Sequence, residues 1–167
     1  MIASRRDRRL FNAAGVLVAA ALMGYALFAQ HVQGYEPCPL CIYQRMVMIA
    51  LGAVFLVAAL HAPAGTAARV YAVLGGLTGL AGAGISGWHG RLQNMPADEV
   101  PACGPGLDYI REVFPLMEEL KMVFTGSGEC AEIDWSFLGL GMPAWVLIWF
   151  VALAALAIAA NWRPVRR

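Results

Sequence analysis

The sequence predicts an all-α integral membrane protein: a four-transmembrane-helix bundle with a long outer loop that carries short amphipathic helices. The composition is the first reason, because 60% of the 167 residues are hydrophobic and only 14% are charged, which is too apolar for a soluble domain of this size. The second reason is that four long runs almost free of charge alternate with short polar segments. Each run is close to the ~20 residues that a helix needs to cross a bilayer. Residues 1–167 are therefore expected to form a single membrane domain.

The runs predict membrane spans over residues 10–29, 42–60, 70–88 and 142–160, with outer loops over 30–41 and 89–141. The second span is the shortest, since it reaches full length only if it begins near Cys41 and carries Arg45 in its first turns. The first run could instead be a secretory signal, because arginines precede it. It is, however, longer than the apolar region of about 7–15 residues typical of such signals.

The basic residues indicate how the chain is oriented in the membrane. Lysine and arginine are enriched on the cytoplasmic side of membrane proteins. The N-terminus, the turn between the second and third spans and the C-terminus hold arginines and a single acidic residue, Asp7, whereas the other loops are rich in acidic residues. Both termini are therefore expected to be cytoplasmic. The net charge of +1 gives no indication of nucleic-acid binding, and the terminal arginines are better explained as anchors at the lipid surface.

All four cysteines, Cys38, Cys41, Cys103 and Cys130, lie in the two outer loops. An even number of cysteines on the oxidising side of a membrane favours disulfide chemistry. The simplest resting state pairs Cys38 with Cys41 and Cys103 with Cys130, although spacing alone does not select the pairing. A bridge from Cys38 to Cys41 closes almost no loop and stabilises little, which favours a redox role. A bridge from Cys103 to Cys130 could equally be a structural staple.

A zinc site made of the four thiolates is the metal-binding alternative. Two features disfavour it. Cys103 and Cys130 are far apart in the sequence rather than forming a second close pair, and an oxidising compartment works against free thiolates. No metal ligand is therefore expected.

Arg45 and His89 are the polar candidates near the close cysteine pair. Arg45 follows Cys41 by one helical turn, and a thiolate at the start of a helix is stabilised by the helix dipole and by a nearby cation. An arginine at the bilayer boundary is a functional candidate, with snorkelling to the headgroups as the alternative. His89 ends the third span in the same leaflet, where it could also be an ordinary interfacial histidine. The dithiol, Arg45 and His89 could form a shallow pocket suited to a quinone, whose carbonyl oxygens need donors.

The second outer loop has apolar residues at helical spacing between Leu107 and Phe124, interrupted at Pro115. This pattern predicts one or two short amphipathic helices, either on the membrane surface or in a small extramembrane core. Glycine and proline around Cys103, and glycine before Cys130, predict backbone that can move. Such backbone suits cysteines that exchange partners.

Four segments together resemble the DsbB family of quinone-coupled disulfide oxidases, which recharge DsbA. The segments are Cys38–Arg45 (CPLCIYQR), Pro101–Pro105 (PACGP), Gly128–Ala131 (GECA) followed by Trp135, and Gly141–Trp145 (GMPAW). The resemblance covers nearly the whole chain, and both the order of the cysteines and the order of the spans agree. It implies a location in the bacterial inner membrane, with the cysteine loops in the periplasm.

The resemblance also implies a role for each candidate residue. Cys103 would exchange with a reduced periplasmic DsbA-type thiol oxidase, with Cys130 as its partner in the loop. Electrons would pass to the Cys38–Cys41 disulfide through a transient bond between Cys130 and Cys38. Cys41 would then face a quinone held by Arg45 and His89. The cofactor would be ubiquinone, with menaquinone as the alternative, exchanging with the membrane quinone pool.

Two other functions compete with this one. The vitamin K epoxide reductase-like group also combines four helices with a C-x-x-C motif, but its reaction runs in the opposite direction. In this sequence the motif precedes the second span, and that position favours the thiol:quinone oxidoreductase. The non-enzymatic alternative is a disulfide-stapled or metal-binding membrane scaffold. In that case Cys38 and Cys41 would be inert or would hold a metal.

Overall fold

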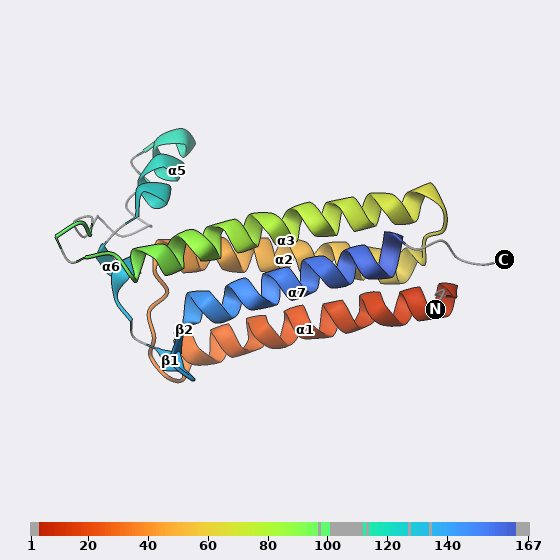
Figure 1. The fold of residues 1–167 in the computed structure, drawn as a ribbon, viewed down its shortest axis with the longest axis horizontal. Helices are drawn as coiled ribbons and strands as arrows, with labels where there is room; N and C mark the ends of the chain where they lie inside the picture. Colours follow the sequence, from red (N-terminus) through yellow and green to blue (C-terminus); the bar gives the residue numbers. More distant parts are fainter. Residues whose placement is uncertain are drawn as a thin grey trace.

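The computed structural model describes residues 4–96, 98–100, 112, 114–126, 128–133 and 135–162. Its long helices are α1 (Arg5–His31), α2 (Pro39–His61), α3 (Thr66–Leu92) and α7 (Met142–Trp162). They lie side by side in a bundle, and both termini are at the same end (Figure 1). All four are long and apolar enough to cross a membrane. The predicted multi-pass helical fold is therefore confirmed for the described part of the chain.

Each helix is longer than the span predicted for it, and at the starts of α1 and α2 the local sequence favours the added residues. Ser4 caps α1: its side chain accepts from the Asp7 N–H at 3.2 Å, and its own N–H donates to Asp7 Oδ2 at 2.8 Å, which is a capping box. Pro39 occupies the first position of α2, where a missing N–H costs nothing. Helix α2 thus takes in Cys41, which the prediction placed in the outer loop 30–41, and Arg45 lies in its second turn.

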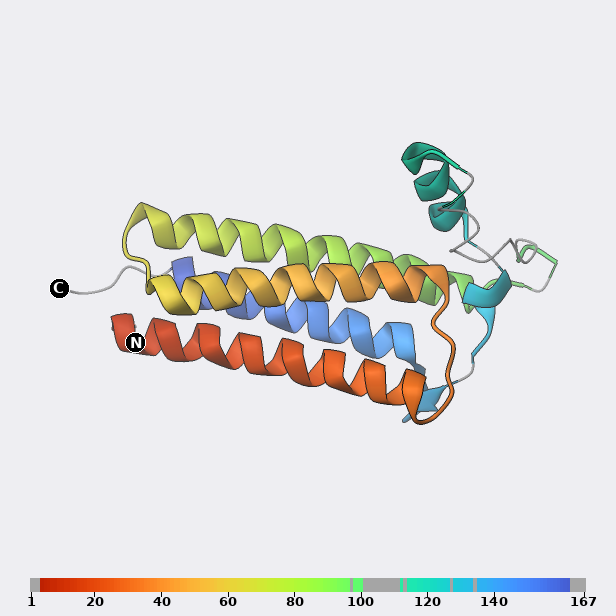
Figure 2. The ribbon, with the colours of Figure 1, turned by 180° about the vertical axis from the view of Figure 1, so that it is seen from behind.

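The opposite end of the bundle carries short elements. These are α5 (Leu116–Thr125), α6 (Gly128–Ala131) and a hairpin of β1 (Ser136–Phe137) and β2 (Leu140–Gly141). The connection between α1 and α2 also crosses this end (Figure 2). The hairpin was not predicted from the sequence. Its turn places both Leu138 (φ 53°) and Gly139 (φ 78°) in the left-handed region, which two-residue hairpin turns of this kind require.

Helix α5, which follows Pro115, confirms one of the one or two short amphipathic helices predicted between Leu107 and Phe124, while residues 107–111 and 113 lie outside the described residues. Val123 is buried with Leu40 and Leu92 of the bundle. Met117 on α5 is 77% exposed. One side of α5 therefore packs on the end of the bundle and the other side is free of it.

Small residues bring α3 and α7 close together. A Cβ atom added at Gly75 would lie 2.6 Å from Ala157 Cβ, one at Gly79 would lie 2.7 Å from Ala154 Cβ, and one at Gly82 would overlap the Phe150 ring. The glycine pattern in the third span thus allows close helix packing, as expected in membranes. Gly84 of the same helix makes no such contact, because it is exposed and nothing lies within 4 Å of an added Cβ.

A polar cluster ties the helices together at the end that carries the termini. The buried Arg8 donates from Nε to the Ala160 carbonyl oxygen at 3.1 Å. Asn12 and Asn161 are also buried and exchange two hydrogen bonds, of 3.1 and 3.0 Å. Because buried polar groups are stable only when they are paired, this cluster fixes α1 against α7.

The glycine contacts give a testable prediction for stability. Gly82→Ala should lower the thermal unfolding midpoint of the protein in detergent, because the new methyl group forces Phe150 to move, and such overpacking typically costs about 1–3 kcal/mol. Gly84→Ala is the matched control in the same helix and should leave the midpoint unchanged or slightly higher. Equal effects of the two substitutions would contradict the close contact at Gly82.

Candidate functional site

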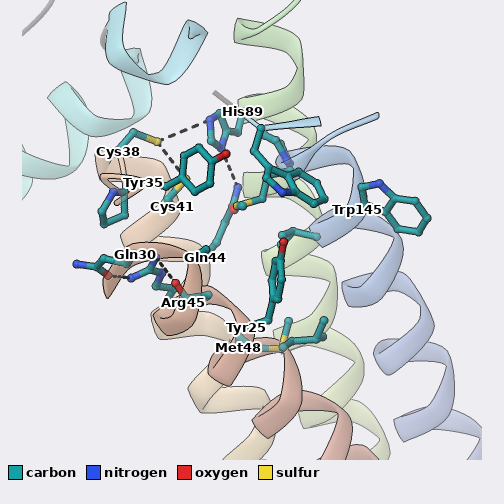
Figure 3. Close-up of a pocket in the computed structure, with 18 of the residues that line it drawn as sticks. Tyr25, Gln30, Tyr35, Cys38, Cys41, Gln44, Arg45, Met48, His89 and Trp145 are labelled. Carbon is teal, nitrogen blue, oxygen red and sulfur yellow. Dashed lines mark hydrogen bonds between the residues drawn. The ribbon is translucent and has the colours of Figure 1, made fainter. Parts of the chain in front are cut away.

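A cavity of about 440 Å³ opens at the end of the bundle that carries the short elements. Side chains of α1, α2, α3 and α7 line it, together with the segment that runs from α6 to the hairpin. Cys38, Cys41, Arg45 and His89 all contribute to its wall (Figure 3). The structure thus brings four of the six sequence-predicted site residues together in one pocket.

The close cysteine pair lies at the start of α2. Cys38 is the N-cap residue and Cys41 lies in the first turn. Their Sγ atoms are 3.3 Å apart, since residues three apart at a helix start face the same side. The position is electropositive, because the first N–H groups of the helix have no partner within it. This favours a thiolate at Cys41.

His89 lies directly beside Cys38. Its ring is buried in α3, 3% exposed, and Nε2 is 3.7 Å from Cys38 Sγ. The other ring nitrogen, Nδ1, is 3.2 Å from Gln44 Nε2. An amide NH₂ group can only donate, so Nδ1 accepts and the proton of the neutral ring lies on Nε2. The ring therefore presents a donor to the Cys38 sulfur.

Gln44 is a site residue that the sequence reasoning did not single out. It is 5% exposed, lies in α2 between Cys41 and Arg45 and also lines the cavity. Its polar side chain within an otherwise apolar helix was the available signal, because polar groups inside a span are costly and usually have a specific partner.

Arg45 lines the same cavity but is held by α1. Its guanidinium group donates to Gln30 Oε1 and to the Ala26 carbonyl oxygen, the latter at 3.2 Å. The side chain is half-buried. These contacts fix the positive charge in the wall of the pocket, one helical turn after Cys41.

Cys130 reaches the same place from the second outer loop. It lies in α6, is 1% exposed and packs with Leu40 and Leu92. The Sγ atoms of Cys130 and Cys38 and a ring nitrogen of His89 all lie within 4.8 Å of one another. Gly128 begins the helical turn that holds Cys130, and the thiol is buried. Cys103 lies outside the described residues.

Aromatic rings form the other wall of the pocket, and the sequence reasoning did not predict them as such. Tyr25 packs edge-on against Trp135, with ring centroids 6.2 Å apart. Phe137 of β1 lies 6.3 Å from Trp135 and 5.9 Å from Trp145. Trp145 Nε1 donates to the Phe137 carbonyl oxygen at 3.1 Å, which fastens the hairpin to α7.

Comparisons with known proteins indicate the family of this chain. The family model described as "Disulfide bond formation protein DsbB" matches residues 8–160. The chain is 51% identical to Disulfide bond formation protein B of Methylococcus capsulatus over 152 residues, covering 91% of this chain and 93% of the relative. It is 51% identical to the protein of the same name from Nitrosococcus oceani over 144 residues, covering 86% and 85% of the two chains.

A third relative of this name, from Hahella chejuensis, is 52% identical over 139 residues, covering 83% of this chain and 84% of its own length. Matches of this extent do not favour an inert scaffold. The chain belongs to the DsbB family and is a multi-pass membrane protein that functions in disulfide bond formation.

Proposed function

We propose that this protein is a thiol:quinone oxidoreductase that reoxidises a periplasmic DsbA-type dithiol oxidase and passes its electrons to a membrane quinone. The observation that carries the proposal is that Cys130 Sγ lies within 4.8 Å of Cys38 Sγ, while Cys38 and Cys41 lie 3.3 Å apart in the wall of an aromatic pocket. Two cysteines from one outer loop and one from the other are thus within reach of thiol exchange. The family resemblance adds Cys103 as the residue that meets the partner.

The exchange steps follow from the order of these sulfur atoms. Attack of reduced partner on a Cys103–Cys130 disulfide forms a mixed disulfide at Cys103 and releases Cys130 as a thiolate. The Cys130 thiolate then attacks Cys38 of a Cys38–Cys41 disulfide. The Cys130–Cys38 bond forms, the Cys38–Cys41 bond breaks, and the electron pair leaves on Cys41. The start of α2 stabilises that negative charge.

The pocket fits a quinone ring. Its volume of about 440 Å³ lies within the range of small-molecule sites, about 300–1,000 Å³. Trp135, Phe137 and Trp145 offer flat apolar walls, while Arg45 supplies hydrogen-bond donors for a carbonyl oxygen. A bound quinone, ubiquinone or menaquinone, supplies a sink for two electrons and two protons and leaves as a quinol.

His89 acts on Cys38 in this proposal. The Nε2 proton faces the Cys38 sulfur at 3.7 Å, so it can stabilise Cys38 as a thiolate when the Cys130–Cys38 bond is broken again. The second cysteine of the partner resolves the mixed disulfide and releases Cys103 as a thiolate, whose attack on Cys130 re-forms the Cys103–Cys130 disulfide and frees Cys38. Cys38 then re-forms its disulfide with Cys41, and a bound quinone would take up the two electrons and two protons. Gln44 holds the ring in the tautomer that this step needs, as hydrogen-bond partners of histidine commonly do.

Reduction potentials explain why a quinone is needed. A DsbA-type partner has a potential of about −120 mV, while structural disulfides lie below about −300 mV. An ordinary disulfide would therefore oppose oxidation of the partner by ~8 kcal/mol. We place the protein in the inner membrane, with its cysteine end in the periplasm and both termini in the cytoplasm. This location gives access to both the partner and the quinone pool.

The electron path can be tested with Cys41→Ser. The purified protein in detergent is mixed with a reduced DsbA-type partner and a short-chain ubiquinone analogue, and quinone absorbance is followed. Wild type should reduce the quinone only when the partner is present, and Cys41→Ser should abolish the reaction, because the electron pair has no thiolate to leave on. Gly84→Ala is the control and should behave like wild type. Quinone reduction by Cys41→Ser, or none by wild type, would refute the proposal.

The role of Gln44 can be tested by separating kcat from KM. Gln44→Leu leaves His89 Nδ1 buried without its donor, a loss that typically costs about 1–3 kcal/mol. We expect kcat to fall about 10-fold, while KM for the quinone changes by less than about 2-fold. A rise in KM with unchanged kcat would show instead that Gln44 shapes the quinone pocket.

A further inference from the structure

Three cysteines and His89 bring possible metal-ligand atoms together near the start of α2. Cys38 Sγ lies 3.3 Å from Cys41 Sγ and 3.7 Å from His89 Nε2. Cys130 Sγ lies within 4.8 Å of Cys38 and His89. These groups come from α2, α3 and α6, and both His89 and Cys130 are buried. Soft sulfur and imidazole donors are the set that zinc and cadmium prefer.

The separations agree with coordination of one cation. Zinc lies about 2.3 Å from thiolate sulfur and about 2.0–2.1 Å from imidazole nitrogen. In a tetrahedral site, the ligand atoms are then about 3.8 Å apart for two sulfurs and about 3.6 Å apart for sulfur and nitrogen. The observed Cys38–Cys41 and Cys38–His89 separations of 3.3 and 3.7 Å lie within about 0.5 Å of these values. Cys130 Sγ lies within 4.8 Å of Cys38 and His89, and Cys41 Sγ lies outside that group. The side chains of Cys41 and Cys130 must therefore turn toward Cys38 and His89 to complete the site.

We propose that the reduced protein binds one thiophilic divalent cation, Zn²⁺ or Cd²⁺, through Cys38, Cys41, Cys130 and His89, and that the bound cation blocks thiol exchange. Binding displaces the thiol protons and transfers no electrons. A disulfide between any two of the cysteines removes ligands, so the oxidised protein lacks the site. Binding is independent of the proposed function, whereas inhibition of turnover rests on it.

Gln44 provides the outer contact that a histidine ligand needs. When Nε2 binds a metal, the ring proton lies on Nδ1, and a ligating histidine usually donates it to a neighbouring oxygen. The amide of Gln44, now 3.2 Å from Nδ1 through its nitrogen, presents its oxygen after a half-turn. A glutamine can therefore support both the metal-free ring and the metal-bound ring.

The proposed site differs from a four-cysteine zinc site in one ligand, since it uses His89 where the other uses Cys103. This difference sets the experiment. Full-length protein in detergent is reduced, freed of reductant and titrated with Cd²⁺, while sulfur-to-cadmium charge-transfer absorption and bound metal per chain are measured. Wild type should bind one equivalent, and the oxidised protein should bind none.

The variants separate the two ligand sets. Cys38→Ser and Cys130→Ser should weaken binding about 100-fold, and His89→Ala about 10-fold or more, since even outer-contact changes cost about 10–100-fold. Cys103→Ser should bind like wild type. Circular dichroism of each variant checks that the helices are retained. Cadmium NMR of the wild-type complex gives a second measure, because its chemical shift distinguishes nitrogen from sulfur donors.

Three results would overturn the inference: no stoichiometric binding by reduced wild type, loss of binding in Cys103→Ser, or a cadmium signal without a nitrogen donor. Turnover gives the separate readout for inhibition. Cd²⁺ should stop quinone reduction, and a chelator should restore it. If cadmium binds as proposed but no quinone reduction occurs without it, the proposed function fails and the site stands. If turnover is normal and Cd²⁺ does not bind, the site fails and the function stands.

Discussion

The constraint on which the structure depends is that backbone N–H and C=O groups in hydrocarbon must be paired within the protein. Helices satisfy this requirement along their length but leave four groups unpaired at each end. Reactive groups in this protein accordingly lie where helices start and stop. Cys38 and Cys41 occupy the start of α2, and His89 lies near the end of α3. The unpaired N–H groups at the start of α2 favour a thiolate at the cysteines there.

The sequence predicts the helices well because their signal is local. Long apolar runs define the bundle, and the position of Pro39 explains why α2 takes in Cys41 and Arg45. The grouping of Arg45 and His89 around the dithiol followed from topology alone, since one span enters the leaflet where the next returns.

The features that the sequence did not predict depend on contacts between distant segments. The burial of Cys130 depends on packing against Leu40 and Leu92, which no spacing rule reveals. The hairpin needs Leu138 in a left-handed conformation that is uncommon for this residue type. In the sequence Gln44 is one polar residue within a motif, and only the structure shows its contact with His89 Nδ1. Side-chain partners across helices are thus the information that the pattern lacks.

The buried pairing of Asn12 with Asn161, together with the bond from Arg8 to Ala160, has a mechanical consequence. It fastens α1 to α7 at one end of the bundle, while the cavity lies between their other ends. A separation of these two helices would then be a rotation about the fastened end, which moves the cavity walls most and the distant end least. A flat lipid-soluble molecule could therefore enter the cavity between α1 and α7 while the hydrogen bonds at the far end of the two helices stay intact.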